Sequence, residues 1–287
     1  MSARQSVIAS FTRRISTSRD FACVWQPRNS GTVADGLILP KASLVFGPWA
    51  KTELFLNAGE DYHSNDARGV TAKFDARHPA LAVIPVQPLP KSYGLEAGAR
   101  SEILPKVQLS VALWAMNLDS EQLWDADAGT TVPSTPTNRQ GVEFSARYTP
   151  KKWLLFDLDV AWSRARFRDT GGYVPEAIES SISAGASIHQ LGPWSASLFM
   201  RYFGPRALTE DDSIRSGASL LFNAQASYRL TKNLQVSADL FNIFNSSPDD
   251  IAYYYVSRVS PTADARPDTH FHPAEPRSLR IALVVSL

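Results

Sequence analysis

The last long polar segment of this 287-residue chain carries the side chains best suited to contact a ligand. Three consecutive tyrosines precede an arginine and two histidines: Tyr253, Tyr254, Tyr255, Arg258, His270 and His272. The histidines form an H-x-H pair that could bind a metal or haem iron, but no third ligand accompanies them. A loop that only packs on its neighbours, or a girdle of interfacial side chains, explains the same residues, so both interpretations stay open.

A second polar group follows a strand-like stretch earlier in the chain. It consists of Tyr62, His63, Ser64, Asn65, Asp66 and Arg68. We expect hydrogen bonds from these side chains to hold the root of the following loop. Contact with a ligand is their second expected task.

Other candidate groups do not complete a catalytic site. Asp157 and Asp159 are two carboxylates on one strand face, about 7 Å apart by strand geometry, a pattern that suggests a hydrolase. A polar wall inside a water-filled barrel explains them better. Gly217 and Ser219 form the first half of a G-x-S-x-G spacing, but Leu221 stands in place of the second glycine. Because the sequence also has no glycine-rich phosphate loop, we expect neither an enzyme nor a cofactor.

Composition excludes several classes of protein. The net charge of +1 gives no sign of a nucleic-acid partner. The single Cys23 rules out an internal disulfide and a cysteine-rich metal site. No apolar run approaches the ~18 to 20 residues of a spanning helix. The mean hydropathy of −0.18 still allows a membrane barrel, because only alternate residues of its strands meet lipid.

The elements that position these groups are strands. From about residue 37, apolar and polar residues alternate with a period of two, which indicates strands with one apolar and one polar face. Connections alternate between short, near residues 48, 103, 150, 192 and 231, and long, near 75, 131, 171, 210 and 261. This asymmetry predicts an antiparallel transmembrane β-barrel of about eleven strands, or twelve if Phe21–Trp25 is one more.

The alternation also predicts which side chains meet lipid and which meet the lumen. The lipid-facing set is Leu109, Val111, Leu113, Leu234, Val236, Leu279, Ile281 and Leu283. The luminal set is Gln108, Ser110, Gln235, Asp239 and Arg280. A register slip of one residue would invert both sets. The long connections, 60–90, 126–138, 204–216 and 246–276, are expected outside the cell, and the short turns in the periplasm.

Two stretches resemble the barrels of TonB-dependent outer-membrane receptors. One reads D-L-F-N-I-F-N at 239–245, then the tyrosine triplet, H-P-A-E-P-R-S at 272–278 and a last strand that finishes the chain. The other reads K-A-S-L-V-F-G-P-W-A-K-T-E-L-F-L-N-A-G at 41–59 and leads into the second polar group. The resemblance covers residues 36–287 and implies the C-terminal half of a larger barrel of about 22 strands.

The resemblance implies an outer-membrane receptor or transporter for energy-coupled uptake of siderophores, haem, cobalamin or oligosaccharides. It places both polar groups at the extracellular lip as candidates for small-molecule contact. Its partners would be outer-membrane lipid and, in a full-length receptor only, a plug domain and the inner-membrane TonB complex. A self-contained small pore or a barrel enzyme remains the alternative.

The N-terminal segment 1–35 matches poorly. Met1–Asp20 lacks the apolar region of a secretory signal, and neither a plug nor an energy-coupling box is visible, so we expect a fragment. Leu287 stands where the family has a terminal aromatic residue. We expect no transport by the chain alone, since eleven strands cannot close with antiparallel pairing throughout.

Overall fold

The computed structural model of the chain is an all-β protein built around one antiparallel sheet. It describes residues 4–18, 27–75, 80–125, 130–258, 260 and 262–286. The main sheet has 12 strands in the order β1-β2-β3-β4-β5-β8-β9-β10-β11-β12-β13-β16. Every pair of neighbours is antiparallel. Two separate hairpins, β6-β7 and β14-β15, lie within the long connections.

The strands of the main sheet and the other elements have the following bounds. The main sheet consists of β1 (Arg4–Ser18), β2 (Gly31–Trp49), β3 (Thr52–Tyr62), β4 (Lys91–Ser101), β5 (Val107–Leu118), β8 (Thr137–Lys151), β9 (Leu154–Phe167), β10 (Ser180–Leu191), β11 (Trp194–Phe203), β12 (Ser219–Arg229), β13 (Leu234–Phe241) and β16 (Ser278–Val285). The remaining elements are η1 (Pro27–Asn29), α1 (Ala67–Thr71), β6 (Gln122–Asp125), β7 (Thr130–Pro133), β14 (Asp249–Ser257) and β15 (Arg266–Pro273).

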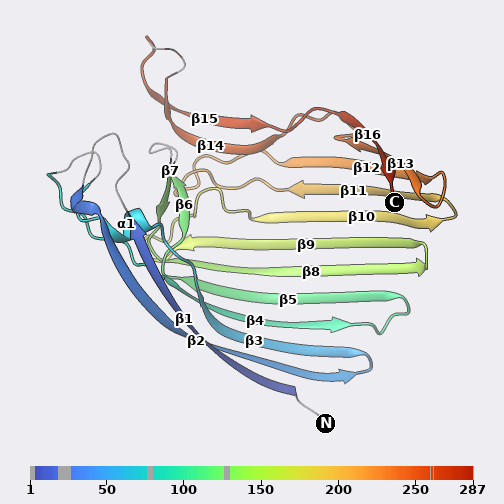
Figure 1. Cartoon of the computed structure of the whole chain (residues 1–287), viewed down its shortest axis with the longest axis horizontal. Helices are drawn as coiled ribbons and strands as arrows, with labels where there is room; N and C mark the ends of the chain where they lie inside the picture. Colours follow the sequence, from blue (N-terminus) through green and yellow to red (C-terminus); the bar gives the residue numbers. More distant parts are fainter. Residues whose placement is uncertain are drawn as a thin grey trace.

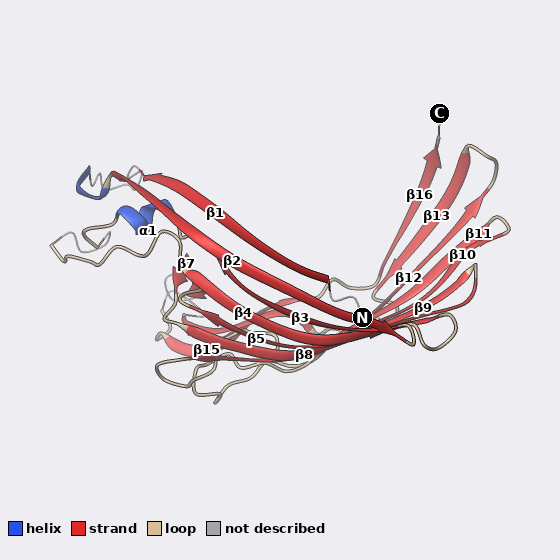
Figure 2. Cartoon of the chain, turned by 90° about the horizontal axis from the view of Figure 1, so that it is seen from below, coloured by secondary structure: helices blue, strands red, loops and turns tan. Residues whose placement is uncertain are grey.

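The sheet bends into an open trough with the strands running along it. Figure 1 shows the strands in sequence order across the sheet, and Figure 2 shows β1 and β16 rising at its two opposite edges. All short turns lie at one end and all long connections at the other. The predicted alternation of short and long connections is therefore confirmed, and the fold is a partial antiparallel barrel.

The N-terminal segment differs from the expectation drawn from the sequence. The strand pattern was expected from about residue 37, whereas β1 covers 4–18 and β2 begins at Gly31. β1 supplies the first strand of the main sheet. Phe21–Trp25, which the sequence suggested as one more strand, lies outside the described residues. The pattern in β1 is hard to recognise because Arg13 and Arg14 interrupt its apolar residues. The 12 strands of the main sheet agree with the expected count of eleven to twelve.

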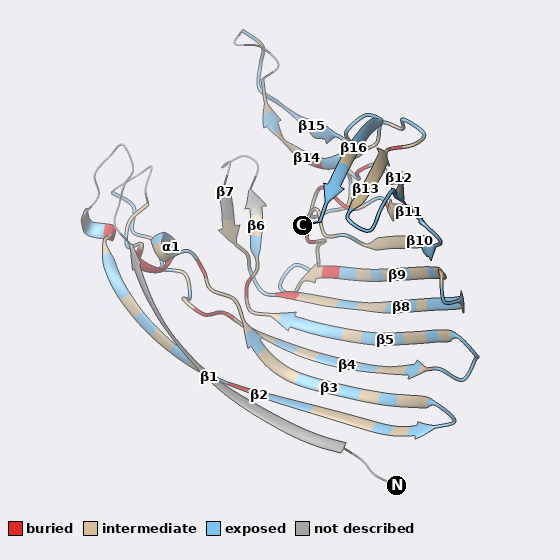
Figure 3. Ribbon diagram, turned by 45° about the vertical axis from the view of Figure 1, so that its right-hand side comes forward, coloured by how far each residue is buried: buried red, intermediate tan, exposed pale blue. Residues whose placement is uncertain are grey.

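The outer face of the trough carries an apolar band that no other part of the described chain covers. Leu113 of β5 is 60% exposed, and Ile281 of β16 is 69% exposed. Rows of such side chains run from strand to strand in register, as in Leu56, Ala97, Leu113, Val142 and Trp162. The predicted apolar and polar sets lie on opposite faces, and exposed and half-buried residues alternate along the strands in Figure 3.

The buried side chains gather at one end of the sheet. Apart from a few positions such as Leu39 and Ala112, they lie where the long connections meet the strands. Examples are Val174, Ala207 and Ala252, each at most 2% exposed. The closely packed region of this protein therefore lies at the end of the sheet where the long connections are.

On the inner face, glycines leave room for aromatic rings to lie along the wall. A Cβ atom added at Gly98 would lie 2.3 Å from the ring of Phe55 and 2.4 Å from the backbone oxygen of Val111. A Cβ added at Gly141 would lie 2.7 Å from the indole of Trp114. Such glycines let large side chains cross the strand next to them.

Gly98→Ala should therefore destabilise the sheet, whereas Gly94→Ala should not. Both glycines lie on the same face of β4, but a Cβ at Gly94 would meet nothing within 4 Å. We expect Gly98→Ala to lower the free energy of unfolding by about 1 to 3 kcal/mol, since backbone has to move. Denaturant unfolding in lipid vesicles measures both variants, and equal stabilities would contradict the close packing at Gly98.

Candidate ligand-binding site

The polar group 62–68 holds the root of the connection between β3 and β4. Asp66 caps α1 by accepting a hydrogen bond from the backbone N–H of Arg68 at 2.8 Å. The guanidinium of Arg68 also binds both carboxylate oxygens of Asp66, at 3.0 Å each. The hydrogen bond from the Arg68 side chain lowers the pKa of Asp66 below its ordinary value. The pair therefore organises the start of the helix, although both side chains are largely exposed.

Asn65 ties this root to two other segments. It is 2% exposed, and its amide nitrogen donates to the backbone oxygen of Gln87 at 2.8 Å. Its amide oxygen accepts a hydrogen bond from Gln122 at the start of β6. The neighbouring His63 donates its backbone N–H to Pro90, while its buried Nε2 has no partner among the described residues. These contacts match the expected task of holding the loop root.

The C-terminal group lies on the hairpin β14–β15. The register pairs Tyr253 with His270 and Ile251 with His272, so these residues share one face of the hairpin. The rings of Tyr255 and His270 stack with centroids 4.0 Å apart, and His270 Nε2 lies 2.9 Å from the hydroxyl of Ser257. We call Tyr253, Tyr255, His270 and His272 the tyrosine–histidine face.

Two predicted residues lie apart from this face. Tyr254 pairs in register with Thr269 on the opposite face of the hairpin. Arg258 follows β14 and is exposed. No three His, Cys, Asp or Glu side chains of the described residues are grouped so that they could hold a metal ion. The structure thus brings four of the six predicted residues together, with no third metal ligand beside His270 and His272.

Next to the hairpin, two long connections interlock and contribute residues that the sequence did not single out. Tyr173, between β9 and β10, lies under the guanidinium of Arg166, whose central carbon is 3.1 Å from the ring centroid. Arg215, between β11 and β12, pairs with Glu179 at 2.7 Å and lies 5.9 Å from the same ring. The Nε atoms of Arg166 and Arg206 are buried without a hydrogen-bond partner among the described residues.

Glu176 belongs to the same group of loops. Its backbone N–H donates to Ala207 at 2.8 Å, which joins the two long connections. Burial raises the pKa of the Glu176 carboxyl to about 7, although the nearby Arg206 acts in the opposite direction. The pKa of Tyr253 is also raised, first by burial and then by the charge of Glu176. Period-two analysis could not identify these residues, because their contacts join loops that are distant in sequence.

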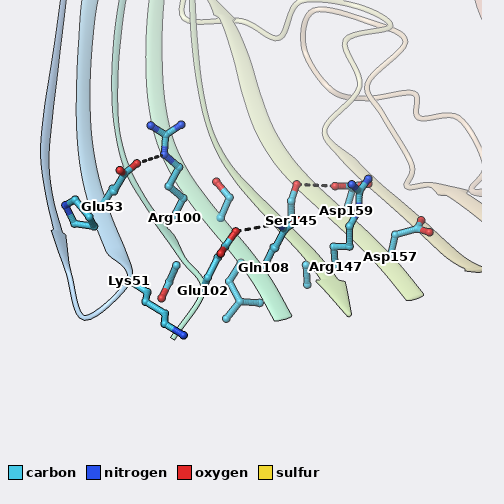
Figure 4. A pocket seen from close by; sticks show the side chains of 14 residues that line it. Lys51, Glu53, Arg100, Glu102, Gln108, Ser145, Arg147, Asp157 and Asp159 are labelled. Carbon is cyan, nitrogen blue, oxygen red and sulfur yellow. Dashed lines mark hydrogen bonds and ion pairs between the residues drawn. The ribbon is translucent and has the colours of Figure 1, made fainter. Parts of the chain in front are cut away.

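The short-turn end of the inner face forms a second polar site. A cavity of about 750 Å³ lies there. Figure 4 shows the charged side chains from β3 to β9 that line it on the inner side of the sheet. Glu53 pairs with Arg100 at 2.7 Å. Ser145 donates to Asp159 at 2.6 Å. Asp159 therefore has the contacts of a wall residue, and Asp157 lies on the same inner face.

Arg147 and Asp157 are opposite each other in register but form no ion pair. The carboxylate of Asp157 instead lies across Gly185 on β10, 2.6 Å from the position of an added Cβ. Figure 4 shows Asp157 pointing away from Arg147. Among the described residues, neither side chain has a hydrogen-bond partner. Both charges are therefore available to another group inside the trough.

The apolar outer band, the charged inner wall and the loops gathered at one end form part of a barrel wall, and a comparison with family models shows which family this barrel belongs to. A family described as "TonB dependent receptor-like, beta-barrel" matches residues 10–243. The chain belongs to this family. No curated protein matches the sequence. Among the described residues, no helix is long and apolar enough to span a membrane.

Solved structures of TonB-dependent receptors share the fold of this chain at low sequence identity. The copper transporter OprC is 16% identical with a TM-score of 0.73, over 99% of this chain and 45% of that chain. The ferric yersiniabactin uptake receptor FyuA from Yersinia pestis is 17% identical with a TM-score of 0.66, over 89% and 38%. The ferripyoverdine receptor of the outer membrane of Pseudomonas aeruginosa is 13% identical with a TM-score of 0.61, over 89% and 34%. The chain spans less than half of each.

The raised pKa of Glu176 predicts a pH-dependent packing of the two long connections. Because the folded value of about 7 exceeds the ordinary 4.5, the packed loops favour the protonated carboxyl. Their stability should be greatest below about pH 4.5, fall as the pH rises to about 7, and then stay constant. Hydrogen-exchange protection of residues 168–179, corrected for intrinsic rates, measures this.

Glu176→Gln should remove that dependence, because the amide stays neutral. Glu275→Gln is the matched control, since it replaces an exposed carboxylate of another loop. The control should keep the decline of the unsubstituted chain. An equal decline with Glu176→Gln would show that a different group titrates.

Proposed function

We propose that this chain forms part of the wall of an outer-membrane receptor for energy-coupled uptake of a small molecule. The observation that carries the proposal is the family match together with the two-faced sheet, apolar outside and polar inside. Lipid covers the apolar band, and water or protein fills the trough. The long connections face the outside of the cell, as the asymmetry of the loops favours.

The ligand binds at the long-loop end. The tyrosine–histidine face offers stacked rings and imidazole nitrogens. The end of β9 adds the guanidinium group of Arg166, and the connection between β11 and β12 adds those of Arg206 and Arg215. Aromatic and cationic groups of this kind suit an anionic or aromatic metal chelate. The structurally similar proteins named above are a copper transporter, a ferric yersiniabactin uptake receptor and a ferripyoverdine receptor. The ligand proposed for this chain belongs to the wider class of siderophores, cobalamin and oligosaccharides.

The polar group 62–68 contributes to binding because it fixes the connection between β3 and β4 in place. Asn65 and Asp66 fix the connection between β3 and β4 by hydrogen bonds, so that Tyr62, His63 and Arg68 stand at the lip of the barrel. The ligand contacts these three residues after the loop is in place. The residues of the loop root and those of the hairpin thus mark two separate parts of one outer rim.

The partners of the proposed receptor are a plug domain and the TonB complex. Among the described residues Arg147 and Asp157 have no partner in the wall, and both lie on its inner face, Asp157 across Gly185, so a plug that fills the lumen meets both charges. Arg147 is exposed and Asp157 half-buried in the open trough, so a plug that removed them from water would have to offer each an opposite charge or a hydrogen bond, because an unpaired buried charge is costly. The receptor carries out transport, and no chemical step on the ligand is part of the proposal.

Binding can be tested with the chain in detergent micelles. The probes are ferric citrate, a ferric catecholate, cyanocobalamin and a maltooligosaccharide, with tryptophan quenching as the readout. Tyr253→Ala and Tyr255→Ala should each weaken binding of the responding probe about tenfold, since an aromatic contact contributes roughly 1 to 1.5 kcal/mol. Tyr254→Ala is the matched control, because Tyr254 lies on the other face of the same strand.

Equal losses from all three tyrosines would contradict a site on the tyrosine–histidine face. Unchanged affinity in all three would place the ligand elsewhere on the rim. No response to any probe, at concentrations up to the millimolar range, would count against an uptake receptor for these four chemical classes.

The chain alone should not import ligand. Exported behind a borrowed signal peptide, residues 1–287 supply barrel wall, and the proposal assigns the coupling of binding to energy input to a plug partner, so uptake should equal that of cells without the chain. Uptake of a radiolabelled probe, with and without a functional inner-membrane energy complex, measures this. Accumulation that depends on the energy complex would refute the expectation, and a receptor with its own plug is the positive control.

A further inference from the structure

Positive side chains gather in and beside the short turns of the barrel wall. They are Lys51, Lys106, Lys151, Lys152, Arg229 and Lys232, and Glu102 is the one carboxylate in these turns. At the other end of the sheet, the connection 119–136 has four acidic residues and no lysine or arginine. A chain whose net charge is only +1 therefore has a basic short-turn end.

Three of the short turns are joined by hydrogen bonds. The backbone N–H of Glu102 donates to the backbone oxygen of Lys51, and that of Thr149 donates to the backbone oxygen of Lys106, at 2.9 Å each. The amine of Lys106 donates to the backbone oxygen of Pro150 at 2.7 Å. Between the turns lies a groove of about 650 Å³. We call it the lysine groove, after the four lysines that line it, Lys51, Lys106, Lys151 and Lys152.

The wall does not neutralise the positive charge of this groove. Among the described residues, the amines of Lys51, Lys151 and Lys152 have no hydrogen-bond or ion-pair partner, and all three side chains are exposed. The carboxylate of Glu102 accepts a hydrogen bond from the amide of Gln108 at 2.9 Å. Figure 4 shows Lys51 at the ends of the strands, below the charged inner wall. One carboxylate against four lysines leaves a net positive charge that an anion can meet.

Two of the four lysines occupy backbone positions that suit other residues better. Lys51 has a φ of 62° and Lys106 a φ of 66°, in the left-handed region that glycine and asparagine adopt more easily. The lysine side chains therefore do not help these turns to form. Their contribution lies in the charge that they bring to the groove.

The apolar neighbours of the groove indicate what kind of anion it meets. Ile103 and Leu104, in the turn between β4 and β5, are 57% and 53% exposed. Trp49 at the end of β2 is also exposed, and Trp153 directly follows Lys152. A membrane surface offers phosphates for amines and, at nearly the same depth, an acyl boundary for indole and aliphatic side chains. The combination therefore favours a lipid headgroup.

We propose that the lysine groove binds the phosphate groups of anionic phospholipids in the leaflet on the short-turn side of the membrane. The amines of Lys51, Lys151 and Lys152 contact the phosphate oxygens, and Lys106 holds the turns together. Because these lysines lie between β2 and β9, the lipid holds this part of the wall at a fixed depth. The inference rests on the membrane location in the proposed function and involves neither a transported ligand nor a plug.

The lipids that stay with the full chain test the proposal. The chain is refolded in uncharged detergent micelles with equal amounts of phosphatidylglycerol and phosphatidylcholine, and the copurified lipids are counted by mass spectrometry. Phosphatidylglycerol should be retained about fivefold over phosphatidylcholine. This preference should shrink between about 50 and 500 mM salt, because salt screens the lysine charges. Equal retention of the two lipids would overturn the proposal, whatever the outcome of the uptake experiments.

Substitutions locate the preference. The triple variant Lys51→Gln, Lys151→Gln and Lys152→Gln should retain both lipids equally, whereas the matched triple variant with Lys→Arg should keep the preference. Lys73→Gln is the charge control, since Lys73 lies in the connection between β3 and β4 at the opposite end of the sheet. A preference that survives the three glutamines, or that Lys73→Gln abolishes, would place the lipid elsewhere and overturn the proposal.

Lys51→Asn separates binding from folding. Because asparagine adopts left-handed backbone more easily, this variant should resist denaturant at least as well as the unsubstituted chain, while its preference for phosphatidylglycerol falls. Gln190→Asn is the matched control, since Gln190 has a φ of 52° beside a turn without lysine, and its preference should be unchanged. Equal preference in both variants would contradict a role for the Lys51 charge.

A competing anion distinguishes the lipid from free phosphate. Millimolar inorganic phosphate, added at constant ionic strength, should leave the count of retained phosphatidylglycerol unchanged, because it has no acyl chains for the apolar neighbours of the groove. Displacement of the lipid by phosphate would show a general anion site and overturn the assignment to phospholipid.

Discussion

The pairing of backbone hydrogen-bond groups is the constraint on which the rest of this structure depends. A chain that meets lipid has no water to satisfy its N–H and C=O groups, so the ladder from β1 to β16 supplies every partner except at the two edges. Extended strands then place side chains alternately on two faces. The apolar outer band and the charged inner wall both follow from that alternation.

Neither face of the sheet is covered by another layer of the described chain. The residues at the long-loop end of the sheet are therefore held in place by contacts among the loops. Val174, Ala207 and Ala252 are buried where long connections meet the sheet, and Asn65 joins three segments through its amide. These contacts convert long polar connections into a fixed surface. The residues that could bind a ligand are therefore positioned by loop packing, while the strands only determine where each loop begins.

The sequence was sufficient for those features that depend on local pattern. The period of two and the alternating connection lengths predicted the strand plan from β2 onward and the two faces of β5, β13 and β16. It did not predict β1, whose pattern is interrupted by Arg13 and Arg14, or the hairpins inside the long loops. The contact of Arg166 with Tyr173 was also invisible, because it joins side chains whose approach depends on the folded loop.

The inner wall shows how glycine controls which polar groups remain available. Glu53 and Arg100 face each other in register and form an ion pair, whereas Arg147 and Asp157 face each other in the same way and do not. The difference is Gly185, which offers Asp157 space on the next strand. Gly98 likewise lets the ring of Phe55 lie along the wall. Small residues on this face therefore keep large side chains out of the lumen and leave selected charges free for whatever fills it.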